Sequence, residues 1–362
     1  MSLHPAAIPL ALASALVAVL VTRLSIHYAL RRSLVDLPGQ RRSHSVPTPR
    51  GGGIGIVAGV VTGLAIGAST RQLASPACVY AIVAVVLVAA VGWIDDHRGL
   101  SARIRIIVHA LAMVVLYVPL FQLAAAMSQL LPAGAGNPDL LATASITALA
   151  AVVFVLANVW SVNLHNFMDG INGLLACQAI FVFLVLAALA PEGGQLIPLL
   201  CAAATAGFLP SNFPRARVFM GDVGSGSLGL LIAWAVVLQA VSFHGSGFSG
   251  LIVCSAFVAD ATCTLLSRML RGRRWYSAHR EHLYQWLVRS GFSHARVVAL
   301  YMGWNLFVVV PVLVAVNRGV GSESKIGGLA WTLAVYALAL VVWIAGKRWC
   351  LRRAKNARRE KA

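Results

Sequence analysis

The sequence predicts an all-α protein that crosses a membrane many times, and two observations support this fold class. Only 40 of the 362 residues are charged, which is 11%, whereas soluble domains carry about 25%. Apolar residues make up 59% of the chain, and the mean hydropathy is +0.82. Such a chain lacks the polar surface that a globule in water requires. The composition therefore excludes a disordered chain, a disulfide scaffold and an ordinary soluble enzyme.

A transmembrane helix needs about 20 mostly apolar residues, and eleven such stretches follow one another. They cover 6–30, 51–69, 76–94, 104–125, 140–160, 172–190, 196–213, 224–243, 249–267, 296–316 and 328–346. The first stretch has its basic residues behind it rather than before it, so we expect a retained helix with an outward N-terminus. We expect a single membrane domain over 1–346 and a basic tail over 347–362.

The basic residues indicate which side of the membrane each loop occupies. Of the 29 Lys and Arg residues, 25 fall on one alternating set of loops or at its edges. The other set has only Arg71, Arg318 and Lys325. The positive-inside rule therefore makes the first set, with the C-terminal tail, cytoplasmic. This topology explains the net charge of +18, so we expect no nucleic-acid partner and assign the tail to lipid headgroups.

Most of the few acidic residues lie on the same cytoplasmic loops. Asp95 and Asp96 directly follow the third stretch, where adjacent carboxylates repel each other and require an arginine, such as Arg98 or Arg103, or a divalent cation. Asp222 lies between glycines at the start of the eighth stretch. Backbone amides at such a helix start can bind phosphate.

A polar stripe precedes the sixth stretch. Asn163, Asn166, Asp169 and Asn172 recur every three residues, so they share one face of a helix. Together with the other inner-face carboxylates, Asp169 gives a set of hard oxygen ligands. Such ligands suit Mg²⁺, with Mn²⁺ as the alternative, better than Zn²⁺.

Two basic segments could bind an anion. Arg41, Arg42, His44 and Arg50 lie in a loop rich in proline and glycine, and they suit either a lipid phosphate or simple positive-inside anchoring. His279 and His282 are three residues apart, which would put both on one helical face. Neighbouring arginines favour an anion there, and a solvated basic loop is the alternative.

One acid lies inside a predicted span. Asp260 falls in the ninth stretch, and such a residue suggests either function or pairing with a neighbouring helix.

Five motifs together resemble the polyprenyl-phosphate N-acetylhexosamine-1-phosphate transferases, glycosyltransferase family 4. They occur in order along nearly the whole chain. They are Pro47-Thr-Pro-Arg-Gly-Gly, Asp95-Asp-His-Arg-Gly-Leu-Ser-Ala-Arg103, Asn163-Leu-His-Asn-Phe-Met-Asp-Gly170, Val218-Phe-Met-Gly-Asp-Val-Gly-Ser225 and His279-Arg-Glu-His282. The wording of the third and fifth motifs is similar to the branch that initiates O-antigen rather than peptidoglycan.

The resemblance implies roles for individual residues. Asp95, Asp96, Asp169 and Asp222 would be catalytic, with Asp96 and Asp222 holding the metal. Phe219 would stack on uracil, and the other candidates would bind substrates. These are Asn163, Asn166, Asn172, Arg41, Arg42, His44, Arg50, Arg103, His279 and His282. The family commonly has a second Asp where this chain has Asn172.

The implied reaction joins a sugar-1-phosphate from a UDP-N-acetylhexosamine to undecaprenyl phosphate and releases UMP, at the cytoplasmic face of the bacterial inner membrane. The N-terminus would then be periplasmic. The sequence leaves open which sugar is used and whether the protein forms a homodimer. A lipid-linked sugar transporter or flippase is the alternative function, although it would place charges near the bilayer midplane. An aromatic prenyltransferase would need carboxylates four apart, and residues 95–100 lack that spacing.

Overall fold

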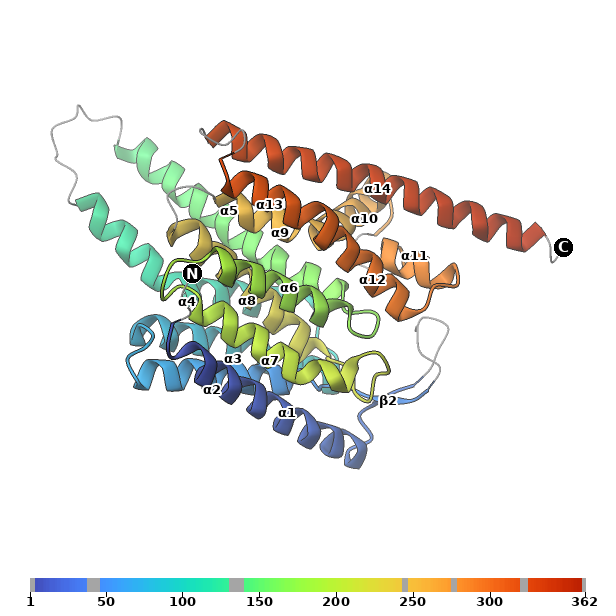
Figure 1. The fold of residues 1–362 in the computed structure, drawn as a ribbon, viewed down its shortest axis with the longest axis horizontal. Helices are drawn as coiled ribbons and strands as arrows, with labels where there is room; N and C mark the ends of the chain where they lie inside the picture. Colours follow the sequence, from blue (N-terminus) through green and yellow to red (C-terminus); the bar gives the residue numbers. More distant parts are fainter. Residues whose placement is uncertain are drawn as a thin grey trace.

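The computed structural model describes residues 4–37, 46–129, 140–242, 247–274, 279–319 and 325–359, and within them the chain is almost entirely helical (Figure 1). The first half contains α1 (Ala7–Arg31), β1 (Val35–Asp36), β2 (Thr48–Pro49), α2 (Ile54–Ser69), α3 (Ser75–Arg98), α4 (Ala102–Gln129) and α5 (Leu140–Phe167). The second half contains α6 (Leu174–Leu189), α7 (Leu196–Asn212), α8 (Asp222–Ser242), α9 (Gly247–Val253), α10 (Ser255–Leu270), α11 (Leu283–Arg289), α12 (His294–Trp304), the π-helical turn η1 (Asn305–Val309), α13 (Val310–Asn317) and α14 (Lys325–Arg359).

Length and composition confirm an all-α polytopic membrane protein. Among the described residues, seven helices are long and apolar enough to cross a membrane by themselves. The helices α2, α6 and α7 are apolar but shorter. The large apolar side chains that remain exposed, such as Leu12, Leu16 and Leu20 on one side of α1, face outward as lipid-exposed residues would.

The helix α8 lies at the centre of the bundle. It packs against α2, α3, α5, α6 and α7. In its most apolar 18-residue segment 78% of the residues are buried, whereas in the corresponding segment of α1 only 28% are. Residues along α8 are small or apolar on every side, which is typical of a helix that other helices surround. The N-terminal end of α8 is therefore fixed by its neighbours.

Several predicted boundaries differ from the observed ones. The third and fifth stretches were expected to end at 94 and 160, but α3 continues to Arg98 and α5 to Phe167. Both therefore bring polar motif residues into their last turns. The ninth stretch is divided at Cys254 into α9 and α10. Residues of the predicted basic tail continue α14 as one helix to Arg359, so α14 is about 52 Å long at 1.5 Å per residue.

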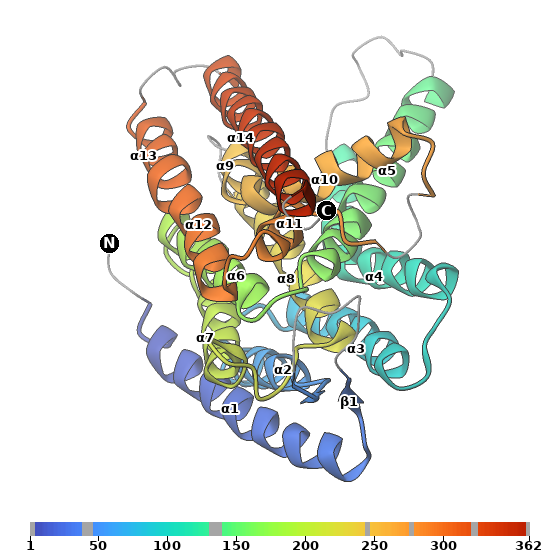
Figure 2. The same cartoon turned by 90° about the vertical axis from the view of Figure 1, so that its right-hand side faces the viewer.

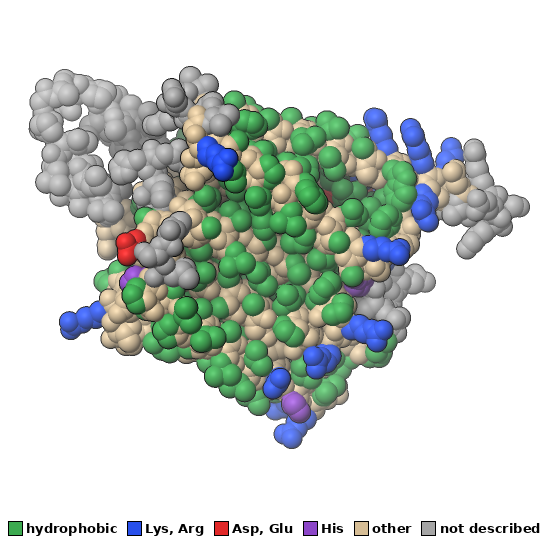
Figure 3. Space-filling model, in the orientation of Figure 1, with side chains coloured by type: hydrophobic (Ala, Val, Ile, Leu, Met, Phe, Trp, Pro, Cys, Tyr) green, Lys and Arg blue, Asp and Glu red, His purple; other side chains and the backbone are tan. Residues whose placement is uncertain are grey.

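Lys and Arg gather at one end of the molecule. On the face shown in Figure 3, most of them lie at the right-hand end, beyond a broad hydrophobic region. The end of α3, the beginning of α8 and the short helix α11 lie toward this end, and the end of α14 extends beyond it (Figures 1 and 2). A small antiparallel pair, β1 and β2, lies beside them, with Val35 opposite Pro49 and Asp36 opposite Thr48.

Candidate active site

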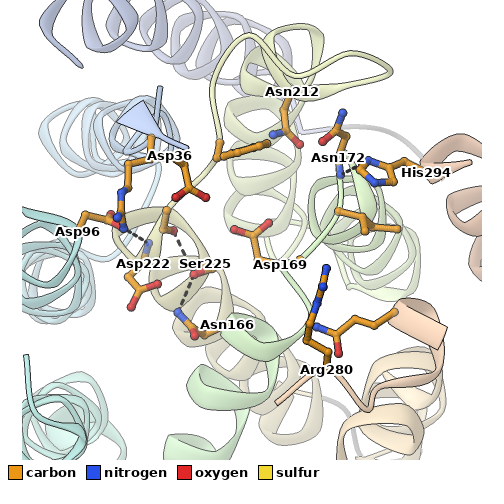
Figure 4. Close-up of a pocket in the computed structure, with 16 residues that line it drawn as sticks. Asp36, Asp96, Asn166, Asp169, Asn172, Asn212, Asp222, Ser225, Arg280 and His294 are labelled. Atoms are coloured by element: carbon orange, nitrogen blue, oxygen red, sulfur yellow. Dashed lines mark hydrogen bonds and ion pairs between the residues drawn. The ribbon is translucent and has the colours of Figure 1, made fainter. Parts of the chain in front are cut away.

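The last turn of α3 and the first turn of α8 are joined through Asp96. The Asp96 carboxylate accepts hydrogen bonds from the backbone N–H groups of Asp222, at 3.2 Å, and Val223, at 3.3 Å (Figure 4). These N–H groups have no partner inside α8, so Asp96 caps the helix. Gly221 precedes them with φ +75°, and a Cβ there would collide with the Asp96 carboxylate. The glycine before Asp222 is thus required by close approach as well as by backbone conformation.

A single arginine connects two of the predicted catalytic carboxylates. Arg105 Nη1, in the first turn of α4, lies 2.8 Å from Asp95 Oδ2 and 3.0 Å from Asp222 Oδ2. The Leu100 backbone N–H also donates to Asp95. The sequence predicts a cation beside Asp95 and Asp96. The arginine beside Asp95 is Arg105 rather than Arg98 or Arg103, and Arg105 was not among the predicted site residues.

The loop before α2 contacts the segment that precedes α8. Backbone N–H groups of Gly52 and Gly53 donate to the carbonyls of Phe219 and Met220, both at 2.9 Å. Arg50 Nη1 is thereby held 3.8 Å from Asp96 Oδ1. This short strand-like pairing brings a loop near residue 50 to the motif near residue 220, a contact that the sequence did not indicate.

The end of α5 supplies the next wall. Asn166 Nδ2 donates to Ser225 Oγ at 3.0 Å, which ties α5 to α8. Asp169 follows the end of α5 and lies in the middle of the site (Figure 4). Burial raises the pKa of Asp169 well above its ordinary value, and the negative charges of Asp222 and Asp96 raise it further. Burial and the neighbouring carboxylates therefore both disfavour the ionised form of Asp169.

The predicted polar stripe is only partly helical. Asn163 and Asn166 lie on α5, whereas Asp169 and Asn172 lie beyond its end. The Asn172 backbone N–H donates to His294 Nδ1 at 3.3 Å, and its side-chain amide donates to the Pro214 carbonyl at 3.2 Å. The four residues therefore do not share one helical face, because the chain turns away after Phe167.

These segments enclose a cavity of about 260 Å³. Its lining contains four carboxylates from four separate segments and two arginines. The lining residues are Asp36, Arg50, Asp96, Asn166, Asp169, Gly170, Ile171, Asn172, Asn212, Phe219, Gly221, Asp222, Ser225, Arg280, Gln285 and His294. The predicted candidates Arg50, Asp96, Asn166, Asp169, Asn172, Phe219 and Asp222 therefore meet in one place.

Several lining residues were not among the predicted candidates. Asp36 belongs to β1, and Arg280 lies in the segment before α11. Asn212, Gln285 and His294 lie outside the motifs that we used. Of these, Asn212 has the clearest structural role, since its side chain accepts from Gly173 N–H at 2.8 Å and donates to the Val218 carbonyl at 3.0 Å.

The two histidines do not line this cavity. His279 precedes α11 and His282 is its N-cap, so neither lies on a helical face as predicted. Their rings are nevertheless 5.0 Å apart. Burial, together with the neighbouring His282 and Arg268, lowers the pKa of His279 to about 4. Burial also lowers the pKa of His282, so both rings are uncharged at neutral pH.

Both histidines line a second, mainly apolar groove of about 560 Å³. Arg105, Asn163, Asn166 and Gln285 complete its polar end, and α4, α5 and α10 supply its apolar walls. The groove lining is Ala102, Arg105, Ile106, Leu156, Val159, Trp160, Asn163, Asn166, Phe167, Leu265, His279, His282 and Gln285. Asn166 and Gln285 line both spaces, so the groove lies directly beside the cavity.

Four further candidates are not part of this arrangement. Arg103 is exposed in the first turn of α4 and lines neither space. Arg41, Arg42 and His44 lie outside the described residues. Their assignments to substrate binding stay predictions.

The donors around the cavity fit a hard divalent cation. In the part of the chain that the structure describes, no three Asp, Glu, His or Cys side chains converge closely enough to hold a metal by themselves. Mg²⁺ is commonly held by only one or two carboxylates together with phosphates and water. Because both Asp96 oxygens accept N–H groups of α8, Asp222 and Asp169 are better placed than Asp96 for this role.

Several known proteins are similar to this chain in sequence. Residues 78–240 match the model of the family described as glycosyl transferase family 4. The chain is 31% identical to the decaprenyl-phosphate N-acetylglucosaminephosphotransferase of Mycobacterium leprae, over 81% of this chain and 79% of the relative. It is 28% identical to a probable undecaprenyl-phosphate N-acetylglucosaminyl 1-phosphate transferase of Bacillus subtilis, over 83% and 82%.

A third relative is similar over still more of its length. It is the undecaprenyl-phosphate alpha-N-acetylglucosaminyl 1-phosphate transferase of Yersinia pestis, at 26% identity over 90% of this chain and 86% of the relative. The residues that match the family model include Asp96, Asp169 and Asp222 of the cavity. The chain therefore belongs to glycosyl transferase family 4, the polyprenyl-phosphate N-acetylhexosamine-1-phosphate transferases.

Proposed function

We propose that this protein transfers a sugar-1-phosphate from a UDP-N-acetylhexosamine to undecaprenyl phosphate and releases UMP. One observation favours this reaction most: a polar cavity with four carboxylates shares Asn166 and Gln285 with an apolar groove. One substrate of the reaction is water-soluble and anionic, and the other has a phosphate on a hydrocarbon chain. The named relatives act on decaprenyl or undecaprenyl phosphate, which supports the same lipid class here.

The cavity suits the nucleotide sugar. Phe219 offers an aromatic face to a uracil ring, a contact that contributes about 1–3 kcal/mol for stacked bases in other proteins. The amide of Asn172 donates to the Pro214 carbonyl, so its oxygen is left to accept a hydrogen bond. The carboxamide can therefore serve as an acceptor where family members commonly have a carboxylate.

The groove suits the lipid phosphate. Arg105, His279 and His282 lie at its polar end, whereas side chains such as Leu156 and Trp160 line the rest. A phosphate at the polar end would lie beside Asp95, which Arg105 holds at 2.8 Å. We assign Asp95 to orienting the incoming phosphate.

A divalent cation, Mg²⁺ or Mn²⁺, would supply charge neutralisation at the diphosphate. Four carboxylates and two arginines line the cavity, so a diphosphate would enter a negatively charged space. Asp222 and Asp169 would hold the cation, while Asp96 fixes the start of α8. Arg50 would lie near the phosphates because it is 3.8 Å from Asp96.

We propose direct transfer. An oxygen of the lipid phosphate attacks the phosphorus that bears the sugar, the bond from this phosphorus to the bridging oxygen breaks, and UMP leaves with that oxygen. A phosphate monoester has a second pKa near 6, so the attacking group is already largely deprotonated at neutral pH. The protein then has to position the two phosphates and stabilise charge rather than remove a proton.

We also propose the topology. Each of the eleven predicted stretches overlaps helical residues, which supports eleven crossings with a periplasmic N-terminus and a cytoplasmic C-terminus. The charge at the end of the molecule where the cavity lies supports a cytoplasmic active site in the bacterial inner membrane. The product would start O-antigen or a related envelope polysaccharide.

Release of UMP tests this function against a transporter or flippase. We expect the purified protein to release UMP only when both undecaprenyl phosphate and a UDP-N-acetylhexosamine are present. UDP-N-acetylglucosamine is the first donor to test, followed by the N-acetylgalactosamine, N-acetylfucosamine and N-acetylquinovosamine analogues. Absence of UMP with every donor would overturn the proposal.

A pair of variants sharpens the test. Asp222→Asn should lower turnover by about 10²–10³, the usual effect of removing one group that stabilises developing charge. Arg215→Gln is the matched control, because Arg215 is exposed in the segment between α7 and α8 and lines neither space. Equal losses in both variants would contradict the assignment of the site.

A further inference from the structure

Asp260 is a buried carboxylate whose place in the fold the reaction does not explain. It lies on α10, is 3% exposed and lines neither the cavity nor the groove. It is nevertheless surrounded by donors from four helices. The donors are Leu283 N at 2.7 Å, Tyr284 N at 3.3 Å, Tyr301 Oη at 2.6 Å, Trp343 Nε1 at 3.0 Å and Thr264 Oγ1 at 3.2 Å.

Two of these donors are the first backbone N–H groups of α11. This helix has only seven residues, Leu283–Arg289, and isolated helices shorter than about 12 residues are marginal in water. It therefore depends on contacts outside itself. Asp260 satisfies two of its unpaired N–H groups, while Tyr301 on α12 and Trp343 on α14 hold the carboxylate from the other side.

The residues at the start of α11 face the proposed substrates. His282 lines the groove, and Gln285 lines both the groove and the cavity. Between them, Tyr284 donates to the Phe167 carbonyl at 2.9 Å and accepts from Gln285 Nε2 at 3.2 Å. The start of α11 is thus attached to the end of α5 on one side and to Asp260 on the other.

We propose that Asp260 is a positioning residue for the transfer reaction, acting through the N-terminus of α11 to place His282 and Gln285 where the groove meets the cavity. The proposal rests on the proposed function only for the identity of the substrates. Asp260 lines neither space, although its Oδ1 lies 3.9 Å from Nδ1 of His282, which lines the groove. It therefore acts through groups that face the substrates rather than on the substrates. Misplacement of a positioned group by about 1 Å can lower turnover by about 10²-fold.

Hydrogen exchange tests the structural part without any substrate. In Asp260→Asn we expect the amides of Leu283 and Tyr284 to exchange at least about tenfold faster, because an uncharged amide is a weaker acceptor for them. Thr264→Val is the matched control, since it removes a donor to the same oxygen from within α10 and leaves α11 attached. Unchanged exchange in Asp260→Asn, or equally fast exchange in the control, would overturn the proposal.

Kinetics test the functional part. We expect Asp260→Asn to lower kcat by about 10²-fold and to raise the KM for undecaprenyl phosphate, with the KM for the UDP-sugar nearly unchanged. A protein that is merely less stable would lose Vmax with the folded fraction and keep both KM values, which would contradict a positioning role. If Asp260→Asn does not fold, Tyr301→Phe detaches the carboxylate from α12, a contact that Thr264 on the same helix as Asp260 does not provide, and should shift the same KM in the same direction.

The two experiments separate the two proposals. Faster exchange in Asp260→Asn, with a wild-type protein that never releases UMP, would support the positioning of α11 and refute the transferase function. Normal exchange in Asp260→Asn, with an active wild-type protein, would refute the positioning proposal alone.

Discussion

Asp96 and Asp260 perform the same structural task in two regions with different surroundings. Each is a buried carboxylate that accepts two backbone N–H groups from the start of another helix, α8 for Asp96 and α11 for Asp260. Around Asp96, further carboxylates and arginines line an open cavity. Around Asp260, the side chains of Tyr301, Trp343 and Thr264 donate further hydrogen bonds, and the His282 ring lies 3.9 Å away.

A buried carboxylate that caps the start of another helix therefore occurs both at the candidate active site and in the packing between helices. Uncharged donors satisfy the Asp260 carboxylate, so that region needs no added charge. The cavity beside Asp96 has four carboxylates and two arginines, and burial, followed by the charges of Asp222 and Asp96, raises the pKa of Asp169 there. A region with unbalanced charge can bind an ionic ligand, whereas a balanced region holds helices together.

The largest expected difference between the two regions follows metal removal. We expect EDTA to abolish UMP release and Mg²⁺ or Mn²⁺ to restore it, because the four carboxylates of the cavity need a cation before a diphosphate enters. Hydrogen exchange of Leu283 and Tyr284, beside Asp260, should not change. Full activity in a metal-free preparation would contradict a need for a cation at the cavity beside Asp96.

The second prediction concerns the route of transfer. Direct attack requires both substrates, so enzyme mixed with UDP-sugar but without lipid phosphate should release no stoichiometric UMP in a single-turnover experiment. A carboxylate nucleophile among Asp95, Asp169 and Asp222 would instead release one UMP per enzyme in a burst. Such a burst would contradict direct transfer and indicate a covalent intermediate on the protein.

The third prediction separates the cavity from the groove. Phe219→Ala should weaken UDP-sugar binding by about 1–3 kcal/mol through loss of ring stacking, with little change for the lipid phosphate. Isothermal titration with each substrate measures both affinities. Equal weakening of the two would indicate that Phe219 only packs the loop against α2.

The smallest effect concerns the segment that precedes α11. Burial by itself would raise the pKa of Glu281, but the hydrogen bond from Arg273 and the charge of Arg268 lower it below its ordinary 4.5. The ionised form is therefore favoured by folding. Its contribution is complete above pH 4.5 and is lost as the pH falls through the lower pKa of the folded protein.

Glu281→Gln should accordingly reduce the stability at pH 7 by about 1–3 kcal/mol, as expected for a hydrogen bond between charged groups, and the difference should shrink in acid. Thermal unfolding in detergent across this pH range measures it. Glu192→Gln is the control, because Glu192 is exposed in the turn between α6 and α7. A difference that grows in acid would contradict the pairing with Arg268 and Arg273.

Local patterns were sufficient for much of the site. Asp96, Asp169 and Asp222 were identified because acidic residues are rare in an apolar chain, and Asp169 and Asp222 each stand beside a glycine. Phe219 was identified from the family resemblance and Asn172 from its spacing of three from Asp169, and both line the cavity. Arg105 was missed because its partners are 10 and 117 residues away, and the sequence marks it only as a charge at the edge of a span.

For His279 and His282, the local pattern predicted the wrong backbone conformation. Their spacing of three predicted a shared helical face, but the backbone there is extended and α11 begins only at Leu283. The helix starts where Asp260, 23 residues earlier, supplies acceptors for its first N–H groups. A spacing rule cannot include an acceptor from another helix.

By itself, the sequence determined the fold class and showed that most acidic and basic residues belong to one set of loops, because hydropathy and charge act residue by residue. Tertiary structure alone decided what each carboxylate contacts. Asp95 and Asp96 are adjacent in the chain, yet one pairs with Arg105 and the other caps α8. Their roles separate because successive side chains on a helix point about 100° apart, and only packing determines what each direction meets.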